Sequence, residues 1–282
     1  MNAKRRSGVK LGYDREASAQ LERTYTTTDV QVQRDAVRRA LAAQPGEVIL
    51  DLGSGPGLLA CELAVEVGAA GKITAVDVSA DMNAIASRRA DEAGMRDRID
   101  VVVGDAAELA FPDACFDAAV STQVLEYVDD VDRALGELRR VLRPGGRLVL
   151  LDTDWDTLVW SARDEARAAR ILEAWSSHAP HARLPRVLAP RLRAAGLQVT
   201  DVFSLTLLNT TFNELTYSYN IAGLIAHYVR TGGGLSEDEV DAWLAELASL
   251  DEDGAYFFSL NRYCFSATPS TSRRSSRSAR RK

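Results

Sequence analysis

The residues with the clearest chemical potential in this sequence form a glycine-rich loop. Gly53, Gly55 and Gly57 occupy alternate positions in it. An apolar run that ends at Asp51 precedes the loop, and a helical pattern begins at Leu58. Glycine lets the backbone approach a ligand closely and adopt positive φ. The N–H groups at the start of the following helix favour a negatively charged ligand group. The loop therefore predicts a ligand site between a strand and a helix.

The spacing of the glycines disfavours two other nucleotide loops. A P-loop carries Lys-Ser/Thr after its last glycine, whereas Leu58 and Leu59 follow Gly57 here. A dinucleotide fingerprint places its third glycine three residues after the second, and that position is Leu58. Neither a phosphate-binding P-loop nor a nicotinamide dehydrogenase fits this pattern.

Two acidic positions follow at the ends of the next two apolar runs. Asp77 comes about 20 residues after the loop, where a carboxylate can accept hydrogen bonds from both ribose hydroxyls. The alternative role of Asp77, capping the next helix, suits Ser79 better. Asp105, flanked by Gly104 and Ala106, offers a carboxylate and a neighbouring N–H to an adenine edge. Three successive strand ends thus carry ligand-binding groups on one edge of a sheet.

The elements that must position these groups alternate between strands and helices. Short apolar strands that alternate with helices indicate an α/β fold, a doubly wound, mostly parallel sheet with right-handed crossovers. The predicted strands are 48–50, 72–76, 99–103, 116–121 and 147–151, and the predicted helices between them are 58–67, 81–93 and 131–141.

The segments on either side of residues 48–152 depart from this alternation. Residues 11–47 predict an N-terminal helical cap, and residues 153–268 predict acceptor-side helices and a terminal hairpin. The hairpin strands are 198–208, with apolar alternation at Val199, Val202, Leu205 and Leu207, and 256–267. The helices are 163–177 and 184–195, then 213–230 and 236–250, which form an excursion over one end of the sheet before the last strand.

The charge is unevenly distributed, and it disfavours a nucleic-acid partner. Basic segments at 1–10 and 269–282 are expected to be disordered. Without their ten Lys and Arg residues, 24 basic and 40 acidic residues remain, a net charge of −16. Such a body is poorly suited to a phosphate backbone. No secretory signal and no apolar run of roughly 20 residues is found, and three scattered cysteines suit a reducing compartment. We expect a cytoplasmic monomer or homodimer.

Five motifs in chain order resemble the class I S-adenosylmethionine (SAM)-dependent methyltransferases. The resemblance is to the small-molecule branch, methyltransferase type 11, which includes the ubiquinone/menaquinone biosynthesis enzymes. It implies a seven-stranded Rossmann-like sheet that binds SAM and releases S-adenosylhomocysteine. The motifs are residues 48–57, 76–79, 104–106, 116–121 and 142–148, over about 105 residues.

The resemblance also implies roles for individual residues. The three glycines line the methionine part of SAM, Asp77 holds its ribose, and Asp105 and Ala106 meet its adenine. Met82 packs on the adenine or takes a core position on its helix. The backbone of Gln123 faces the methionine part, and Tyr13 and Tyr25 fold over the cofactor. The complete cofactor set is Asp51, Gly53, Ser54, Gly55, Gly57, Asp77, Val78, Met82, Gly104, Asp105, Ala106, Gln123, Tyr13 and Tyr25.

The acceptor half of the reaction is less specified by the sequence. Methyl transfer from a sulfonium needs no metal, and positioning supplies of order 7–11 kcal/mol in well-oriented cases. A weak base helps if the acceptor is a hydroxyl or a protonated amine. Acids at 152, 154 and 156 lack the glycine turn and distal acid of a calcium loop, so we predict no metal. Candidate bases are His178, His181, His227, Glu126, Asp152 and Asp154.

Aromatic residues after the fifth strand either wall an acceptor pocket or pack a lid. They are Trp155, Trp160, Phe212, Tyr217, Tyr219 and Tyr228, with Asn220 among them. We therefore expect a methyltransferase that acts on O, N or C of a small, partly apolar metabolite. The alternatives are a non-catalytic SAM-binding regulator or scaffold, and an RNA or protein methyltransferase that uses the basic tail.

Overall fold

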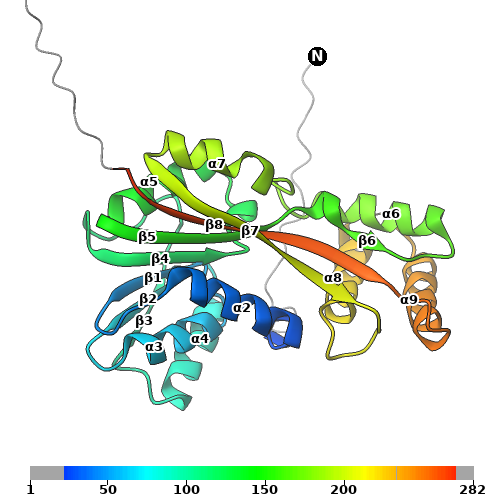
Figure 1. Cartoon of the computed structure of the whole chain (residues 1–282). Coiled ribbons are helices and arrows are strands. Elements are labelled where there is room, and N and C mark those ends of the chain that lie inside the picture. Colours follow the sequence, from blue (N-terminus) through cyan, green and yellow to red (C-terminus); the bar gives the residue numbers. More distant parts are fainter. Residues whose placement is uncertain (1–21, 233, 271–282) are drawn as a thin grey trace, which may run out of the picture.

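The computed structural model describes residues 22–232 and 234–270. Tyr13, residues 1–10 and most of the basic tail lie outside the described residues. Within them a single sheet has the strand order β3-β2-β1-β4-β5-β8-β6, and β7 pairs with β8 (Figure 1). The strands are β1 (Val48–Leu52), β2 (Lys72–Asp77), β3 (Ile99–Val103), β4 (Phe116–Thr122), β5 (Leu142–Thr153), β6 (Val159–Trp160), β7 (Leu197–Asn209) and β8 (Phe258–Pro269).

The first five strands are parallel, so their carboxyl ends meet at one edge. In register, Leu52 of β1 lies beside Val76 of β2 and Ser121 of β4. β8 runs antiparallel to β5 and β7. The doubly wound, mostly parallel sheet is confirmed. The described residues contain eight strands rather than seven, because the two-residue strand β6 also pairs with β8.

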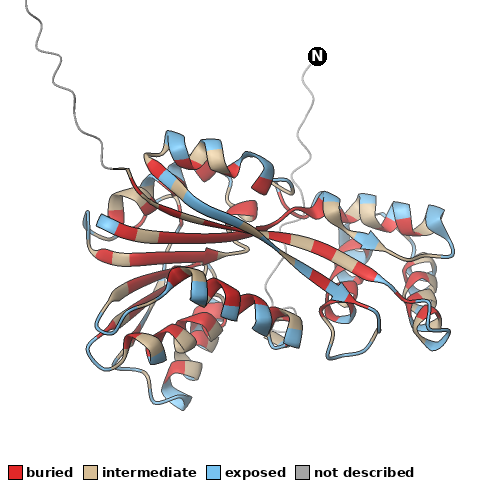
Figure 2. Cartoon of the chain, viewed as in Figure 1, coloured by how far each residue is buried: buried red, intermediate tan, exposed pale blue. Residues whose placement is uncertain are grey.

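Helices cover both faces of the sheet, and a second group packs at one end of it. α2 (Thr28–Leu41), α3 (Leu58–Val67) and α4 (Ala80–Glu92) lie on one face, and α5 (Val131–Val141) and α7 (Pro185–Ala194) lie on the other (Figure 1). Figure 2 shows the buried residues running along the strands between these layers. α6 (Glu165–Trp175), α8 (Tyr217–Gly232) and α9 (Glu237–Glu252) surround the far ends of β7 and β8, so the predicted helical excursion is confirmed.

The terminal hairpin is confirmed, with one correction to its pattern. β7 and β8 pair from Leu197 opposite Pro269 to Asn209 opposite Phe258. Leu207 is buried and Leu205 half-buried, as predicted, but Val202 is 46% exposed. Successive strand side chains point to opposite faces, so Val202 cannot share a face with Leu205 or Leu207. A bulge between Val199 and Asp201 interrupts the ladder just before it.

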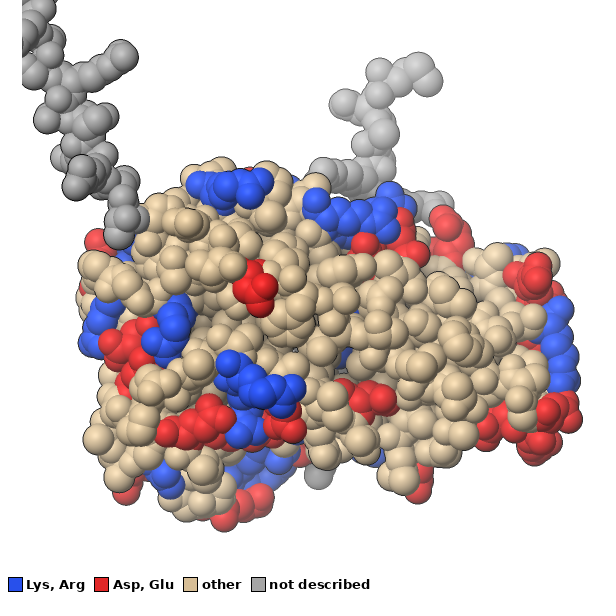
Figure 3. All heavy atoms as spheres, in the orientation of Figure 1, with Lys and Arg blue, Asp and Glu red and all other residues tan. Residues whose placement is uncertain are grey.

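Charged side chains of both signs share the surface of the described residues. Basic and acidic side chains of the described residues lie interspersed on the face drawn in Figure 3. Among the described residues, we find no helix with the length and apolarity needed to span a membrane.

Candidate functional site

The glycine loop is shaped by close contacts that only glycine allows. Gly53, Gly55 and Gly57 all have positive φ, at 72°, 51° and 78°. A Cβ on Gly53 would lie 2.0 Å from a methyl of Val124, just after β4. A Cβ on Gly57 would lie 2.9 Å from the Cβ of Ala86 in α4. The loop is therefore clamped between the end of β4 and α4, with its backbone available to a ligand.

Asp77 faces this loop from the end of β2. Its Oδ2 accepts the N–H of Gly55 at 2.9 Å, and its Oδ1 accepts the N–H of Ser79 at 2.8 Å. Burial raises the pKa of Asp77, against the backbone hydrogen bonds that lower it. The Ser79 hydroxyl caps α4 by accepting the Met82 N–H, so Asp77 does not serve as the cap, as predicted. The carboxylate is thus positioned beside the loop.

Two buried polar groups in the loop region have no partner among the described residues. The Oδ2 of Asp51 and the Oγ of Ser54 are both buried and unbonded. Burial, with smaller contributions from Asp77 and Glu62, raises the pKa of Asp51 to about 7. A buried carboxylate without a partner is unfavourable, and a cationic ligand group would relieve it. SAM carries an ammonium and a sulfonium, so these residues fit that cofactor.

The residues predicted to meet adenine lie at the ends of β2 and β3. Asp105 is exposed and its Oδ1 accepts the N–H of Ala107 at 2.7 Å. Gly104 leaves room for Val76, whose methyl lies 2.9 Å from where a Cβ would stand. Val78 is 72% exposed, whereas Met82 is 3% exposed and belongs to an apolar cluster that includes Tyr217. Met82 is thus buried in an apolar cluster, and its contact with adenine stays a prediction.

Tyr25 and Gln123 complete the surroundings of the loop. The ring of Tyr25 comes within 4.0 Å of the Cβ position of Gly55. Gln123 follows β4 with a φ of 57°, and its side chain donates to the Thr153 hydroxyl at 3.4 Å. A non-glycine residue in this region costs of order 1–3 kcal/mol, and such strain is often found at functional sites. Their contacts with the cofactor stay predictions.

A buried polar cluster lies next to Gln123, at the ends of β4 and β5 and beside the middle of β8. The Glu126 cluster consists of Glu126, Asp152, Trp155, Trp175, His178, Tyr217 and Arg262. Glu126 Oε2 accepts the backbone N–H of Thr153 at 3.3 Å and the indole N–H of Trp155 at 3.2 Å. Asp152 accepts the backbone N–H of Glu126 at 3.4 Å. Two carboxyl groups, one imidazole and one guanidinium are thus buried together beside the loop.

The two carboxyls of the cluster hold protons unusually tightly. Burial raises the pKa of Glu126 to about 7, although Arg262 and hydrogen bonds oppose the shift. Burial and the charge of Glu126 raise the pKa of Asp152 well above its usual range. A carboxyl that titrates near neutral pH is suited to take up a proton during catalysis.

His178 brings a basic nitrogen into the same cluster. Its ring stacks on Trp175, with centroids 3.7 Å and planes 9° apart. Its Nδ1 lies 2.7 Å from the carbonyl oxygen of Trp175, which can only accept, so Nδ1 carries the hydrogen. Burial lowers the pKa of His178 to about 4, and the ring is neutral at pH 7. Nε2 therefore carries a lone pair, and it has no partner among the described residues.

Three other candidate bases, His227, Asp154 and His181, lie outside the cluster. His227 is exposed on α8, so the helix turns it away from the buried ring contacts. Asp154 is held by Arg186 through two contacts of 2.6 and 3.0 Å. The ring of His181 lies 3.4 Å from the Asp129 carbonyl, although its backbone N–H binds the Glu126 carbonyl. Of the four, only His178 contacts the cluster side chains.

The predicted aromatic residues divide between the cluster and the lid. Trp155, Tyr217 and Tyr228 are buried, and Trp160 packs on Trp243. Tyr219 is 42% exposed. Asn220 bonds to the carbonyl groups of Glu214 and Thr216, which is a structural role. Arg262 was missed by sequence reasoning, and the signal that points to it is a single cation in the aromatic-rich strand 256–267.

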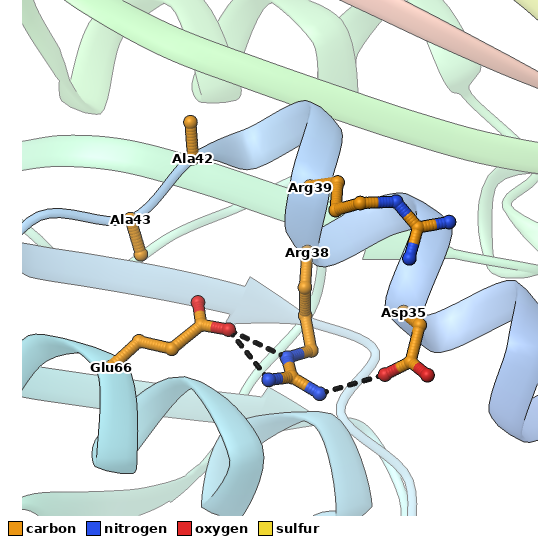
Figure 4. Close-up of a pocket in the computed structure, with 6 residues that line it drawn as sticks. All are labelled: Asp35, Arg38, Arg39, Ala42, Ala43 and Glu66. Carbon is orange, nitrogen blue, oxygen red and sulfur yellow. Dashed lines mark hydrogen bonds and ion pairs between the residues drawn. The ribbon is translucent and has the colours of Figure 1, made fainter.

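A surface hollow near α2 is unrelated to this site. Figure 4 shows Arg38 in it, bound to Glu66 at 2.7 Å and to Asp35 at 2.9 Å. The hollow adjoins the last turn of α2 and the segment before β1. It therefore lies at the edge of the sheet where the parallel strands begin. The glycine loop lies at the opposite edge.

Comparisons with known proteins agree with this geometry. A model of the methyltransferase domain family matches residues 50–150. The ubiquinone/menaquinone biosynthesis C-methyltransferase UbiE of Bordetella avium is 32% identical over 181 residues, which are 58% of this chain and 68% of that protein. The chain belongs to the class I SAM-dependent methyltransferases.

Two further matches cover more of this methyltransferase than residues 50–150. An uncharacterized 37.1 kDa protein in transposon TN4556 of Streptomyces fradiae is 32% identical over 86% of this chain and 68% of that protein. The crystal structure of the [4+2]-cyclase SpnF has a TM-score of 0.57 at 25% identity and covers 86% of this chain and 82% of that one. The match to the 2-phytyl-1,4-naphtoquinone methyltransferase of Synechococcus elongatus spans about half of that enzyme's length, at 48%. The cofactor of this enzyme is SAM.

Proposed function

We propose that this methyltransferase moves the methyl group of SAM to O, N or C of a small, partly apolar metabolite that binds against the Glu126 cluster. The observation that carries the proposal is the position of this cluster. Val124 packs against Gly53 of the cofactor loop, and Glu126 follows two residues later. A methyl donor above the loop and an acceptor at the cluster would therefore be neighbours.

The cofactor residues of this chain have separate tasks in the proposal. Asp51 offers its unpartnered oxygen to the cofactor ammonium, and Asp77 accepts the ribose hydroxyls. Asp105 and Ala106 meet the adenine, and Tyr25 covers the loop. SAM supplies an electrophilic methyl on a positively charged sulfur and leaves as S-adenosylhomocysteine.

The acceptor residues orient the nucleophile and take its proton. Glu126 is the group whose pKa, about 7, best suits removal of a proton from a hydroxyl or a protonated amine near neutral pH. His178 offers a second lone pair at Nε2. The indole of Trp155 fixes the Glu126 carboxyl by donating to Oε2. Positioning then supplies much of the acceleration, since the methyl carbon is already activated.

The test is methyl transfer by the full chain. Methyl-labelled SAM, incubated with the protein and a panel of aromatic and aliphatic metabolites, is expected to give a labelled organic product and an equal amount of S-adenosylhomocysteine. Calorimetry on the same protein is expected to show SAM binding, and its absence would contradict the proposal.

A second candidate is a SAM-binding protein that does not methylate. The observation that supports this candidate is the structural similarity to a protein named as a [4+2]-cyclase. It predicts SAM binding with no label transferred to any acceptor, so the same incubation separates the two. Cytoplasmic location and a monomeric or homodimeric state remain predictions, and light scattering on the purified chain checks the second.

A further inference from the structure

Arg262 is a fully buried cation in the strand next to the cluster. It lies in β8 opposite Thr153 of β5, with 0% of its surface exposed. Its Nη1 donates to the side-chain oxygen of Gln33 in α2, and its guanidinium carbon lies 4.7 Å from the ring centre of Tyr217. No carboxylate of the described residues comes within ion-pair distance of it. Arginine is rarely fully buried without such a partner, because losing water costs several kcal/mol.

The two nitrogens of Arg262 that lack partners lie on the same side of the guanidinium. Nε and Nη2 have no hydrogen-bond partner among the described residues, whereas Nη1 is occupied. The N–H groups of Nε and Nη2 point in parallel along one edge of the planar group. This edge matches the two oxygens of a carboxylate in a bidentate pair. The free part of Arg262 is therefore a carboxylate-binding fork.

The groups around Arg262 suit a flat ligand. Trp155, Trp175 and Tyr217 supply ring surfaces in one apolar cluster. Trp175 Nε1, His178 Nε2 and Glu126 Oε1 are buried polar atoms without partners there. Each such atom costs about 1–3 kcal/mol, and a ligand with polar substituents would satisfy them.

The fork lies on the acceptor side of the sheet. β1, which carries the glycine loop, is separated from β8 by β4 and β5. Three strand spacings amount to about 14 Å. A cofactor that is held by the loop and by the ends of β2 and β3 extends along the other half of this edge.

We propose that Arg262 selects an aromatic acceptor by binding its carboxylate through Nε and Nη2. This inference rests on the proposed function and adds the substrate class, a planar aromatic acid. The ligand carboxylate supplies the anionic partner that Arg262 lacks, and Glu126 remains the base for the proton of the nucleophile. The site then stays electrically balanced with Arg262 paired.

The first test compares an acid with its neutral isostere. The full chain, saturated with S-adenosylhomocysteine, is titrated by calorimetry with 2-naphthoate and with 2-naphthamide. The wild type and the control Arg140→Gln, whose arginine is paired with Glu137 on α5, are expected to bind the acid at least tenfold more tightly. Arg262→Gln is expected to bind both within twofold, and Arg262→Lys to keep part of the preference. Equal or absent binding in the wild type, or a preference retained by Arg262→Gln, would overturn the proposal.

The second test separates an acceptor carboxylate from the carboxylate of the cofactor. The affinity of Arg262→Gln for S-adenosylhomocysteine is expected to stay within twofold of the wild type. A tenfold loss would assign Arg262 to the cofactor and overturn the proposal. A wild type that binds no S-adenosylhomocysteine would instead refute the proposed function, and naphthoate titrations without it would still test Arg262.

The third test addresses a structural role of Arg262. Burying a charge without an ion-pair partner costs several kcal/mol, and an apolar residue of similar volume removes this cost. The ligand-free Arg262→Met variant is therefore expected to unfold at the wild-type temperature or above. A decrease of several degrees would show that the charge is needed for folding, and it would overturn the proposal.

Discussion

The cofactor half and the acceptor half of this enzyme are built differently. In residues 48–152 the backbone shapes the site, which is formed by three glycines with positive φ and by the ends of three strands. On the acceptor side the site is a buried group of side chains from β5, β8, α6, α8 and the turns that follow β4 and β5. A backbone site needs short motifs, whereas a side-chain site needs segments brought together from far apart.

The two halves also treat their acids differently. Asp77 in the cofactor half is stabilised by two backbone N–H groups from its own vicinity. In the acceptor half Asp152 accepts the backbone N–H of Glu126, and the charge of Arg262, which lies beyond ion-pair distance, lowers the pKa of Glu126 against the effect of burial. Backbone hydrogen bonds thus oppose the rise that burial causes in the pKa of Asp77, whereas the charge of Glu126 adds to the rise in the pKa of Asp152. Three substitutions test this difference between the two halves.

The largest effect is expected from Gly53→Ala. The added Cβ would lie 2.0 Å from Val124, at a φ of 72°. Strain and overpacking together should cost roughly 4 kcal/mol of folding stability and abolish measurable SAM binding. Urea unfolding and calorimetry measure the two. Gly145→Ala is the control, since its φ is also positive but no atom lies within 4 Å of its Cβ position. Equal losses in both variants would show that the contact with Val124 is unimportant.

The next effect is the pH dependence introduced by Glu126. Its pKa rises from 4.5 in the unfolded chain to about 7 in the folded one. The folded state thus holds a proton that the unfolded state has lost, and the stability from this group is lost as pH rises from 4.5 through 7. Ligand-free Glu126→Gln should match the wild type near pH 4.5 and exceed it by up to about 3 kcal/mol at pH 8.

Urea unfolding at both pH values measures this difference. Glu108→Gln, which changes an exposed carboxyl, is the control and should differ little from the wild type. A Glu126→Gln curve parallel to that of the wild type would mean that Glu126 titrates normally. Glu126 would then not be suited to act as a base near neutral pH.

The smallest effect is expected from Asp77→Ala. Loss of the carboxylate removes its predicted ribose hydrogen bonds and releases the N–H of Gly55. SAM affinity should fall at least tenfold, or about 1.4 kcal/mol, while the fold is retained. Asp100→Ala, an exposed acid in β3 that pairs with Lys72, serves as the control. Calorimetry that gives unchanged affinity for Asp77→Ala would remove this residue from the site.

Most of the cofactor half could be predicted because its signals are local. The helices 58–67 and 131–141 and the strand 99–103 were predicted with the bounds that the structure shows. β5 begins at Leu142 rather than Arg147, because Leu142 already pairs with Phe116 before the Pro-Gly-Gly turn. Val202 was misplaced because its neighbours suggested an apolar face that strand geometry forbids.

The acceptor half could be predicted only in outline. The sequence named Glu126, Asp152 and His178 among six possible bases and could not choose between them. Burial separates them, since it raises the pKa of Glu126 and lowers that of His178, whereas His227 stays exposed. Burial depends on which helices close over the strand ends, and no short motif encodes that.

The sequence alone determined the cofactor, because glycine spacing and strand-end acids act through backbone geometry that a few adjacent residues fix. The tertiary structure alone decided which side chains face the acceptor. Arg262 meets Gln33 across 229 residues of chain, and it meets Tyr217 only because β8 and α8 pack together. A charge acquires its chemistry from its surroundings, and for Arg262 those surroundings exist only in the folded molecule.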